Sequence, residues 1–307
     1  KVRSLTLSNF TLEEVKSLYE QHTAATGQIF THQAINHAYD LTQGQPWLVN
    51  AIARQVTQYL AEDVNIPITV DLINQAKDIL IQRQDTHLDS LAERLREDRV
   101  KAIIEPILSG EELPNTPEDD RRYLLDLGLV IRSKEGGLKV ANPIYQEVIP
   151  KVLSQGTQDS LPMIQPSWLT PTGELNPQIL LETFLDFWRQ HGEPLFKSTP
   201  YPEIAPHLVL MAFLHRVVNG GGSLEREYAI GSGRMDICLR YGDVVLGMEL
   251  KVWKQGKADP LPKGLIQLDK YLSGLNLDTG WLVIFDRRPD LPPISDRTTT
   301  EIALSPQ

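Results

Sequence analysis

Apolar positions recur at helical spacing through the first part of the chain, which predicts an all-helical domain over residues 1–85. Thr11 precedes Glu14 by the spacing of a capping box. Val15 and Tyr19 follow at helical intervals, so a first helix begins here. Three more helices are expected, and Gly44-Gln45-Pro46 separates the first two of them: 31–41, 47–60 and 70–82.

The pattern changes in residues 86–155, where helical stretches are followed by two short strands. The expected elements are helices over 91–108 and 117–127, a hairpin of 128–132 with 137–141, and a last helix over 142–152. Helices followed by a two-stranded wing are typical of a winged helix-turn-helix domain.

Residues 156–176 are rich in Pro, Ser, Thr and Gly and have no periodicity, so we interpret them as a linker. The domain that follows, 177–307, opens with a helix over 176–191 whose apolar stripe is expected to pack on its core. The stripe consists of Leu180, Leu181, Phe184, Leu185 and Trp188.

Residues 244–252 alternate with the period of a strand. One face carries Glu249 and Lys251, and the other face is apolar. Gly242-Asp243 is a two-residue hairpin signal, and a turn there places Asp236 opposite Glu249. Residues in opposed positions have Cβ atoms about 4.5–5.5 Å apart, and two like charges there destabilise a sheet. A divalent cation would turn this repulsion into a binding site, which indicates metal-assisted phosphodiester chemistry.

Further elements surround this hairpin: a helix over 203–218, a strand over 224–228, a helix over 261–273 that Gly274 ends, and a strand over 280–285. With Asp236, Glu249-Leu250-Lys251 and then Gln267-x-x-x-Tyr271 in this α-β-β-β-α-β order, the last third of the chain resembles the PD-(D/E)XK nuclease superfamily. Gln-x-x-x-Tyr is similar to the motif of its RecB-like branch. The resemblance implies a restriction-endonuclease-like α/β/α domain with a mixed sheet.

The resemblance also implies roles for these residues. Asp236, Glu249 and the Leu250 backbone carbonyl would hold Mg²⁺, for which Mn²⁺ can substitute. Lys251 would orient the attacking water and stabilise charge on the phosphate. Gln267 and Tyr271, which share one helix face, would contact the active site or the DNA backbone.

Glu203 would be the first-helix acid of the family and a further metal ligand, although an acid after Pro202 is also good capping chemistry. Other residues are weaker candidates: Glu225 and Glu227 as alternatives to Glu203, His207 facing the site, and Arg226 and Arg234 on phosphate.

Simpler interpretations stay open for the main candidates. Asp236 could be a surface aspartate, and Glu249 and Lys251 could belong to a cross-strand salt bridge. The pair Gln267 and Tyr271 could be a polar helix face with a buried tyrosine.

Gly44-Gln45-Pro46-Trp47 resembles the Gly-x-Pro motif in the lid of AAA+ and STAND-type ATPases, whose lid is followed by a winged helix. The family usually has an arginine where Trp47 stands, and the chain has no Gly-x-x-x-x-Gly-Lys-Ser/Thr phosphate loop. We therefore expect no ATPase activity from this chain, and an ATPase domain upstream in the same polypeptide as its partner. Three acids at 118–120 repel phosphate and favour protein docking by the winged helix over DNA reading.

With 307 residues, 41% of them hydrophobic and 23% charged, the chain has room for two or three globular domains. The net charge of −10 argues against a protein that coats nucleic acid. A local basic cluster nevertheless follows the candidate site and would contact phosphate or be a solvated loop: Lys251, Trp253, Lys254, Lys257 and Lys263.

A single cysteine, Cys238, excludes an internal disulfide and is expected to be a buried thiol. The longest apolar run, 208–214, is far shorter than the ~20 residues of a membrane span, so we expect a cytoplasmic protein with no membrane partner. A start at Lys1, without methionine, is expected of a piece cut from a longer protein.

Together the patterns predict a multidomain α plus α/β protein: a helical lid, a winged helix, a linker and a nuclease-like domain. The expected function is Mg²⁺-dependent hydrolysis of DNA, as the effector of an ATPase-containing protein; a homo-oligomer is compatible with this. The alternatives are a non-catalytic nuclease fold that binds DNA or protein, and an assembly platform driven by the helical half. For the enzyme, Glu249→Ala or Lys251→Ala is expected to abolish cleavage without unfolding the domain.

Overall fold

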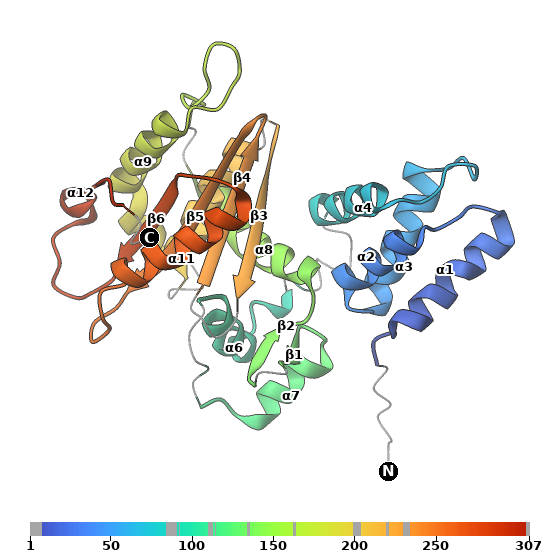
Figure 1. Cartoon of the computed structure of the whole chain (residues 1–307). Coiled ribbons are helices and arrows are strands. Elements are labelled where there is room, and N and C mark those ends of the chain that lie inside the picture. The colour runs from blue at the N-terminus through green and yellow to red at the C-terminus, as the bar shows by residue number, and fades with distance from the viewer. Residues whose placement is uncertain are drawn as a thin grey trace. The chain divides into compact units, whose positions relative to one another are not determined.

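The structure is a computed structural model that combines helices with a mixed sheet, as expected of an α plus α/β protein (Figure 1). It forms two compact units, Lys1–Leu95 with Pro117–Ile149 and Arg96–Thr116 with Pro150–Gln307. Within the described residues, no helix is long and apolar enough to cross a bilayer. The residues that the structure describes are 8–83, 91, 93–109, 113, 115–133, 136–161, 164–198, 204–218, 221–229 and 234–304.

The first unit begins with the helices that the periodicity predicts: α1 (Leu12–Thr26), α2 (His32–Thr42), α3 (Pro46–Gln55) and α4 (Val70–Arg83). The capping box is confirmed, because the Glu14 amide donates to Thr11 Oγ1 (3.3 Å) and the Thr11 amide donates to Glu14 Oε2 (2.8 Å). The helix expected over 47–60 changes to a π-helix, η1 (Val56–Leu60), in its last five residues. Inside the unit, the buried Tyr19 hydroxyl donates to the Val49 carbonyl, and burial raises the pKa of this tyrosine.

The turn before α3 requires a glycine at position 44. Gly44 has a φ of 71°, and its carbonyl accepts a hydrogen bond from the Phe10 amide (2.8 Å). A Cβ atom here would lie 1.8 Å from the Phe10 carbonyl oxygen. Gln45 then caps α3, since its side chain accepts from the Leu48 amide (2.7 Å). The Gly44-Gln45-Pro46 motif therefore has a structural basis of its own.

The rest of the first unit holds α7 (Glu118–Asp126), the antiparallel strands β1 (Val130–Arg132) and β2 (Leu138–Val140), and the start of α8 (Pro143–Ser160). An ion pair between Lys77 and Glu147 (3.0 Å) joins α4 to α8. In contrast, α6 (Asp98–Ser109), which the winged-helix prediction groups with these elements, belongs to the second unit. The division into a lid and a winged helix stays a prediction.

The second unit is built on a four-stranded sheet in the order β3 (Gly222–Ala229), β4 (Arg234–Tyr241), β5 (Val244–Trp253) and β6 (Gly280–Asp286). The pairs β3–β4 and β4–β5 are antiparallel, and β6 is parallel to β5. The crossover between β5 and β6 is α11 (Leu261–Leu275), as a parallel pair requires.

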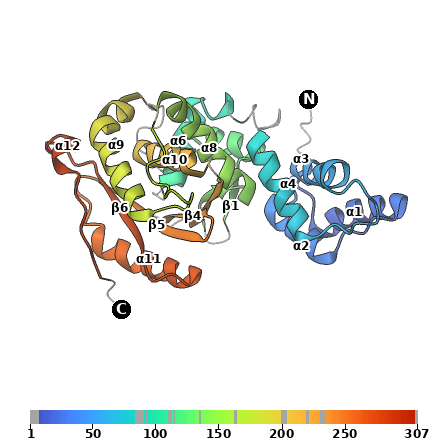
Figure 2. The same ribbon diagram turned by 90° about the horizontal axis from the view of Figure 1, so that it is seen from above.

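Helices cover both faces of this sheet (Figure 2). On one face α9 (Pro177–Ser198) and α10 (Ala205–Val218) form an aromatic core with the strands, in which Phe213 contacts Phe184 and Phe187, and Leu246, Met248 and Leu250 of β5 are buried. On the other face α11 packs on β5 and β6. A short helix, α12 (Ile294–Arg297), contacts α9.

Several boundaries differ from the prediction because tertiary contacts decide them. Helix α8 runs on to Ser160, and Trp168 and Leu175 of the expected linker are buried in the core of the second unit. Helix α11 does not end before Gly274 but at Asn276, whose φ of 57° closes the helix in the left-handed conformation.

Gly44→Ala is expected to destabilise the chain strongly, because it adds a Cβ that overlaps the Phe10 backbone. Gly27→Ala is the matched control: Gly27 also has a positive φ (81°), but no atom lies within 4 Å of the place that a Cβ would occupy. We expect a loss of about 1–2 kcal/mol for Gly27→Ala and at least about 3 kcal/mol for Gly44→Ala. Urea unfolding followed by circular dichroism measures both, and equal losses would contradict the close contact.

Gly280→Ala is expected to separate β6 from β5, because its Cβ would lie 2.6 Å from the Gly247 carbonyl oxygen. The expected cost is about 1–3 kcal/mol of unfolding free energy. Gly274→Ala in α11 has no atom within 4 Å and is expected to stabilise the helix by up to about 1 kcal/mol. The two midpoints of urea unfolding should therefore move in opposite directions, and a stabilised Gly280→Ala chain would show that the strands are not in close contact.

Candidate functional site

The hairpin predicted from Gly242-Asp243 is confirmed, with its register. Tyr241 pairs with Val244, and five residues further from the turn Asp236 pairs with Glu249. Gly242 has a φ of 55°, whereas Asp243 is not among the residues of positive φ, as in a type II′ turn with glycine first. The two acids thus occupy opposed positions on neighbouring strands.

The register extends this pair into a row of three acids. Glu227 of β3 pairs with Asp236 of β4, which pairs with Glu249 of β5, and Leu282 of β6 completes the row. Directly paired residues lie on the same face of a sheet. The structure therefore places Glu227, a secondary candidate in the sequence, next to Asp236 on the face that carries Glu249.

Glu249 and Lys251 lie on the middle strand and are buried, with 0% and 8% of their surface exposed. The Lys251 ammonium forms an ion pair with Glu249 Oε1. The sequence left a cross-strand salt bridge open, but this ion pair joins two residues of the same strand, β5. It explains how two charges are tolerated in the interior, because a buried charge without a partner costs several kcal/mol.

Helix α11 brings Tyr271 and Gln267 to the same face. A Cβ at Gly247 would lie 3.5 Å from Tyr271 Cε1 and 2.8 Å from Leu272, so α11 covers the face of β5 that continues to Glu249. Gln267 lies one helical turn earlier, about 6 Å along the helix. Glu249 lies about 6.6 Å along β5 from Gly247. Because α11 runs back from the end of β5, these ideal spacings predict that Gln267 lies at the level of Glu249. The side-chain oxygen of Gln267 is shielded from solvent.

Other sequence candidates are not brought to this face. His207 of α10 is 3% exposed and contacts Phe285 in the core on the opposite face of the sheet, so it does not face the site. Arg226 pairs with Ile237, one position out of step with Asp236, and so lies on the opposite face as well. Glu203 lies outside the described residues.

The structure also gives the positions of the remaining residues that the sequence singled out. Glu225 and Arg234 occupy the same face as Asp236 by their positions in the strands. Cys238 is buried, as expected of a structural thiol. Leu250 points its side chain into the core formed with α9 and α10.

A feature that the sequence analysis missed lies where β5 and β6 end. Trp253 and Asp286 are register partners, and Trp253 lies on the face of Glu249 and Lys251. Arg288 stacks on Trp253, with its guanidinium carbon 3.6 Å from the ring centroid. It also donates to both carboxylate oxygens of Asp286 (2.6–3.1 Å), which lowers the pKa of Asp286 and raises that of Arg288. No local spacing in the sequence links Arg288 to Trp253, because the contact depends on the parallel register of β5 and β6.

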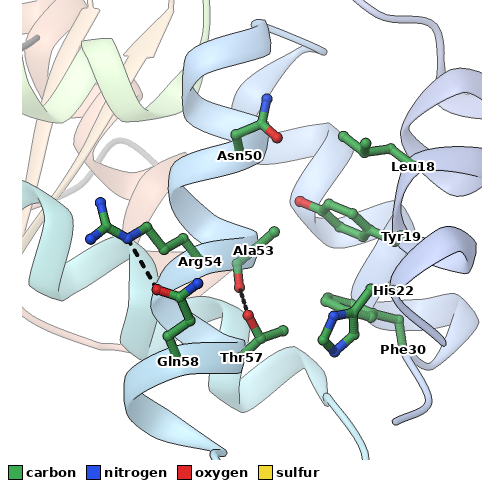
Figure 3. Close-up of a pocket in the computed structure, with 9 residues that line it drawn as sticks. All are labelled: Leu18, Tyr19, His22, Phe30, Asn50, Ala53, Arg54, Thr57 and Gln58. Atoms are coloured by element: carbon green, nitrogen blue, oxygen red, sulfur yellow. Dashed lines mark hydrogen bonds between the residues drawn. The ribbon is translucent and has the colours of Figure 1, made fainter. Parts of the chain in front are cut away.

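A separate pocket of about 250 Å³ lies in the first unit, between α1, α3 and η1 (Figure 3). Its polar side chains have partners in the protein: His22 bonds the neighbouring Gln28 (2.9 Å), Arg54 bonds Gln58 (3.2 Å), and Thr57 donates to the Ala53 carbonyl (2.8 Å). No acidic side chain lines it; the lining is Leu18, Tyr19, His22, Phe30, Asn50, Ala53, Arg54, Thr57 and Gln58.

Comparison with known proteins does not assign the chain to a family. No protein-family model matches the chain, and no curated protein matches it.

The buried ion pair predicts non-additive effects of substitution. Lys251→Met leaves the Glu249 charge buried without its ammonium, and Glu249→Met does the converse, so each is expected to cost about 3–5 kcal/mol. The double variant removes both charges at similar volume, and we expect it to lie within about 1 kcal/mol of wild type. Urea unfolding followed by tryptophan fluorescence tests this, and a double variant equal to the sum of the singles would contradict the pairing. The burial also means that single alanine substitutions destabilise the domain, contrary to the expectation from the sequence.

Proposed function

We propose that the chain is a metal-dependent nuclease of the PD-(D/E)XK type that hydrolyses DNA phosphodiester bonds. The observation that carries the proposal is the pairing of Asp236 with Glu249, with Lys251 next on the same face. A helix layer on each side of a mixed sheet, and Gln267 and Tyr271 on the helix above this face, agree with that fold.

The donor chemistry fits a divalent cation. Paired acids on neighbouring strands offer the carboxylate oxygens that Mg²⁺ and Mn²⁺ prefer, and Glu227 adds a third acid to the row. In this proposal Asp236, Glu249 and the Leu250 carbonyl hold the ion. Glu203 stays a candidate ligand from the family resemblance, and Glu227 is the candidate that the register favours.

The bound ion would polarise the phosphate and lower the pKa of a water molecule. Side chains of the protein would supply the other catalytic functions. Lys251, released from Glu249, would place its ammonium near the attacked phosphate and stabilise the developing charge. Gln267 would orient the strand or the water through its amide, and Tyr271 would hold the helix over the site.

A non-catalytic scaffold is the second candidate, and one observation favours it. The Glu249–Lys251 ion pair by itself accounts for both buried charges, so these residues could be kept for stability alone. In either case we propose that the helical half is the lid and winged helix of an AAA+ or STAND-type protein. An upstream ATPase domain would then be its partner, in the cytoplasm, and the assembly could be a homo-oligomer.

The test is cleavage of single-stranded and plasmid DNA with Mn²⁺ and with EDTA by wild type, Asp236→Asn and the double variant Glu249→Met/Lys251→Met. We expect metal-dependent cleavage by wild type and a loss of at least about 10²-fold in both variants. The double variant is informative because it is expected to stay folded. In parallel, Mn²⁺ should raise the unfolding midpoint of wild type alone.

Cleavage by the double variant at the wild-type rate would exclude the proposed site. Wild type that neither cleaves nor gains stability with Mn²⁺ would favour the scaffold. The unfolding midpoint shows whether each protein is folded, so a loss of cleavage caused by misfolding can be recognised.

A further inference from the structure

The stack of Arg288 on Trp253 lies in line with the proposed catalytic residues. Glu249, Lys251 and Trp253 follow one another on one face of β5, and each step along that face is about 6.6 Å. A ligand bound at Lys251 would therefore reach Trp253 within the length of about one nucleotide. The Trp253 ring is the first aromatic side chain beyond Lys251 on this face.

The stack is held on several sides, so its geometry is set before any ligand binds. Asp286 binds the edge of the Arg288 guanidinium through both oxygens. The Trp253 indole donates to the Lys257 carbonyl (3.2 Å), and Arg297 donates to the Asp286 carbonyl (2.5 Å). Such preorganisation lowers the entropy lost on binding.

The surroundings differ in charge from the rest of the chain. Residues 251–263 and 286–297 together carry seven basic and four acidic side chains, whereas the whole chain has 30 basic and 40 acidic ones. The Arg288 side chain is 37% exposed, so it is accessible from solvent. A basic, partly exposed region next to the site attracts an anionic polymer.

A guanidinium plane held by its edge and backed by an indole is a surface for a planar ligand. Unpaired bases bind proteins by stacking on aromatic rings and on arginine planes. Bases inside a duplex stack on each other and are closed to such contacts. A surface of this kind therefore favours single-stranded over double-stranded nucleic acid.

From these observations we propose that the Arg288–Trp253 stack binds an unpaired base of single-stranded DNA next to Lys251, so that the site acts on single strands. This inference rests on the proposed nuclease function. It makes Arg288 and Trp253 positioning residues for the substrate. The alternative is that the stack only closes the end of the sheet.

Binding without cleavage tests the inference. Fluorescence anisotropy in EDTA would compare a labelled single-stranded oligonucleotide with its duplex on the 307-residue chain. We expect wild type to prefer the single strand, and Arg288→Gln and Trp253→Leu to weaken single-strand binding roughly 5- to 150-fold. Trp253→Phe, which keeps a ring, should retain most of the affinity.

Two variants separate stacking from charge. Arg288→Lys keeps the charge but loses the plane, so it should bind as weakly as Arg288→Gln. Arg189→Gln is the matched control, because Arg189 is also paired with an aspartate, Asp186, and is 36% exposed on α9 of the same unit; it should bind as wild type. Circular dichroism would confirm that each variant is folded. If Arg288→Gln or Trp253→Leu does not fold, the conservative variants Arg288→Lys and Trp253→Phe still test the inference.

Wild-type affinity in Arg288→Lys, or equal affinity of wild type for duplex and single strand, would overturn the inference. So would an Arg189→Gln variant as weak as Arg288→Gln. If metal-dependent cleavage is observed together with any of these results, the proposed nuclease function holds and only the role of the Arg288–Trp253 stack is excluded. Single-strand binding through the stack, without cleavage, would instead remove the nuclease and keep the binding site.

Discussion

An ionised carboxylate without exposed surface in the interior of a sheet is costly unless a partner lies beside it, and the second unit meets this constraint at Glu249. Lys251 supplies the charge because two residues along a strand return to the same face. The apolar residues between and before them then have to face the other way, into the core with α9 and α10. The ion pair thus lies on the face of β5 under α11, and the apolar side chains of the same strand form the core on the other face.

The sequence predicts this region well because its signals are local. A two-residue turn at Gly242-Asp243 and an alternating strand are enough to give the pairing of Asp236 with Glu249. The same holds for the capping box of Thr11 with Glu14, which sets the start of α1. That Gln267 and Tyr271 share one helix face also follows from a local signal, their spacing of four residues.

Contacts between distant segments could not be predicted in this way. Arg288 stacks on Trp253 through the parallel register of β5 and β6, which no local spacing reveals. The orientation of His207 depends on which face of α10 meets the sheet, and nearly all of α10 is buried, so its pattern has no polar side to read. The burial of Trp168 in a segment rich in proline has the same origin: the core of another part of the chain accepts it.

The parallel pairing of β6 with β5 also has a consequence for how the chain folds. The β4–β5 hairpin closes over two residues, whereas the connection between β5 and β6 spans the whole of α11 and costs more chain entropy to close. In the folded chain α11 covers the face of β5 that carries Glu249 and Lys251. The packing of this one helix therefore both removes water from the ion pair and brings Gln267 and Tyr271 over it, so we expect burial of the charges and assembly of the site to occur together.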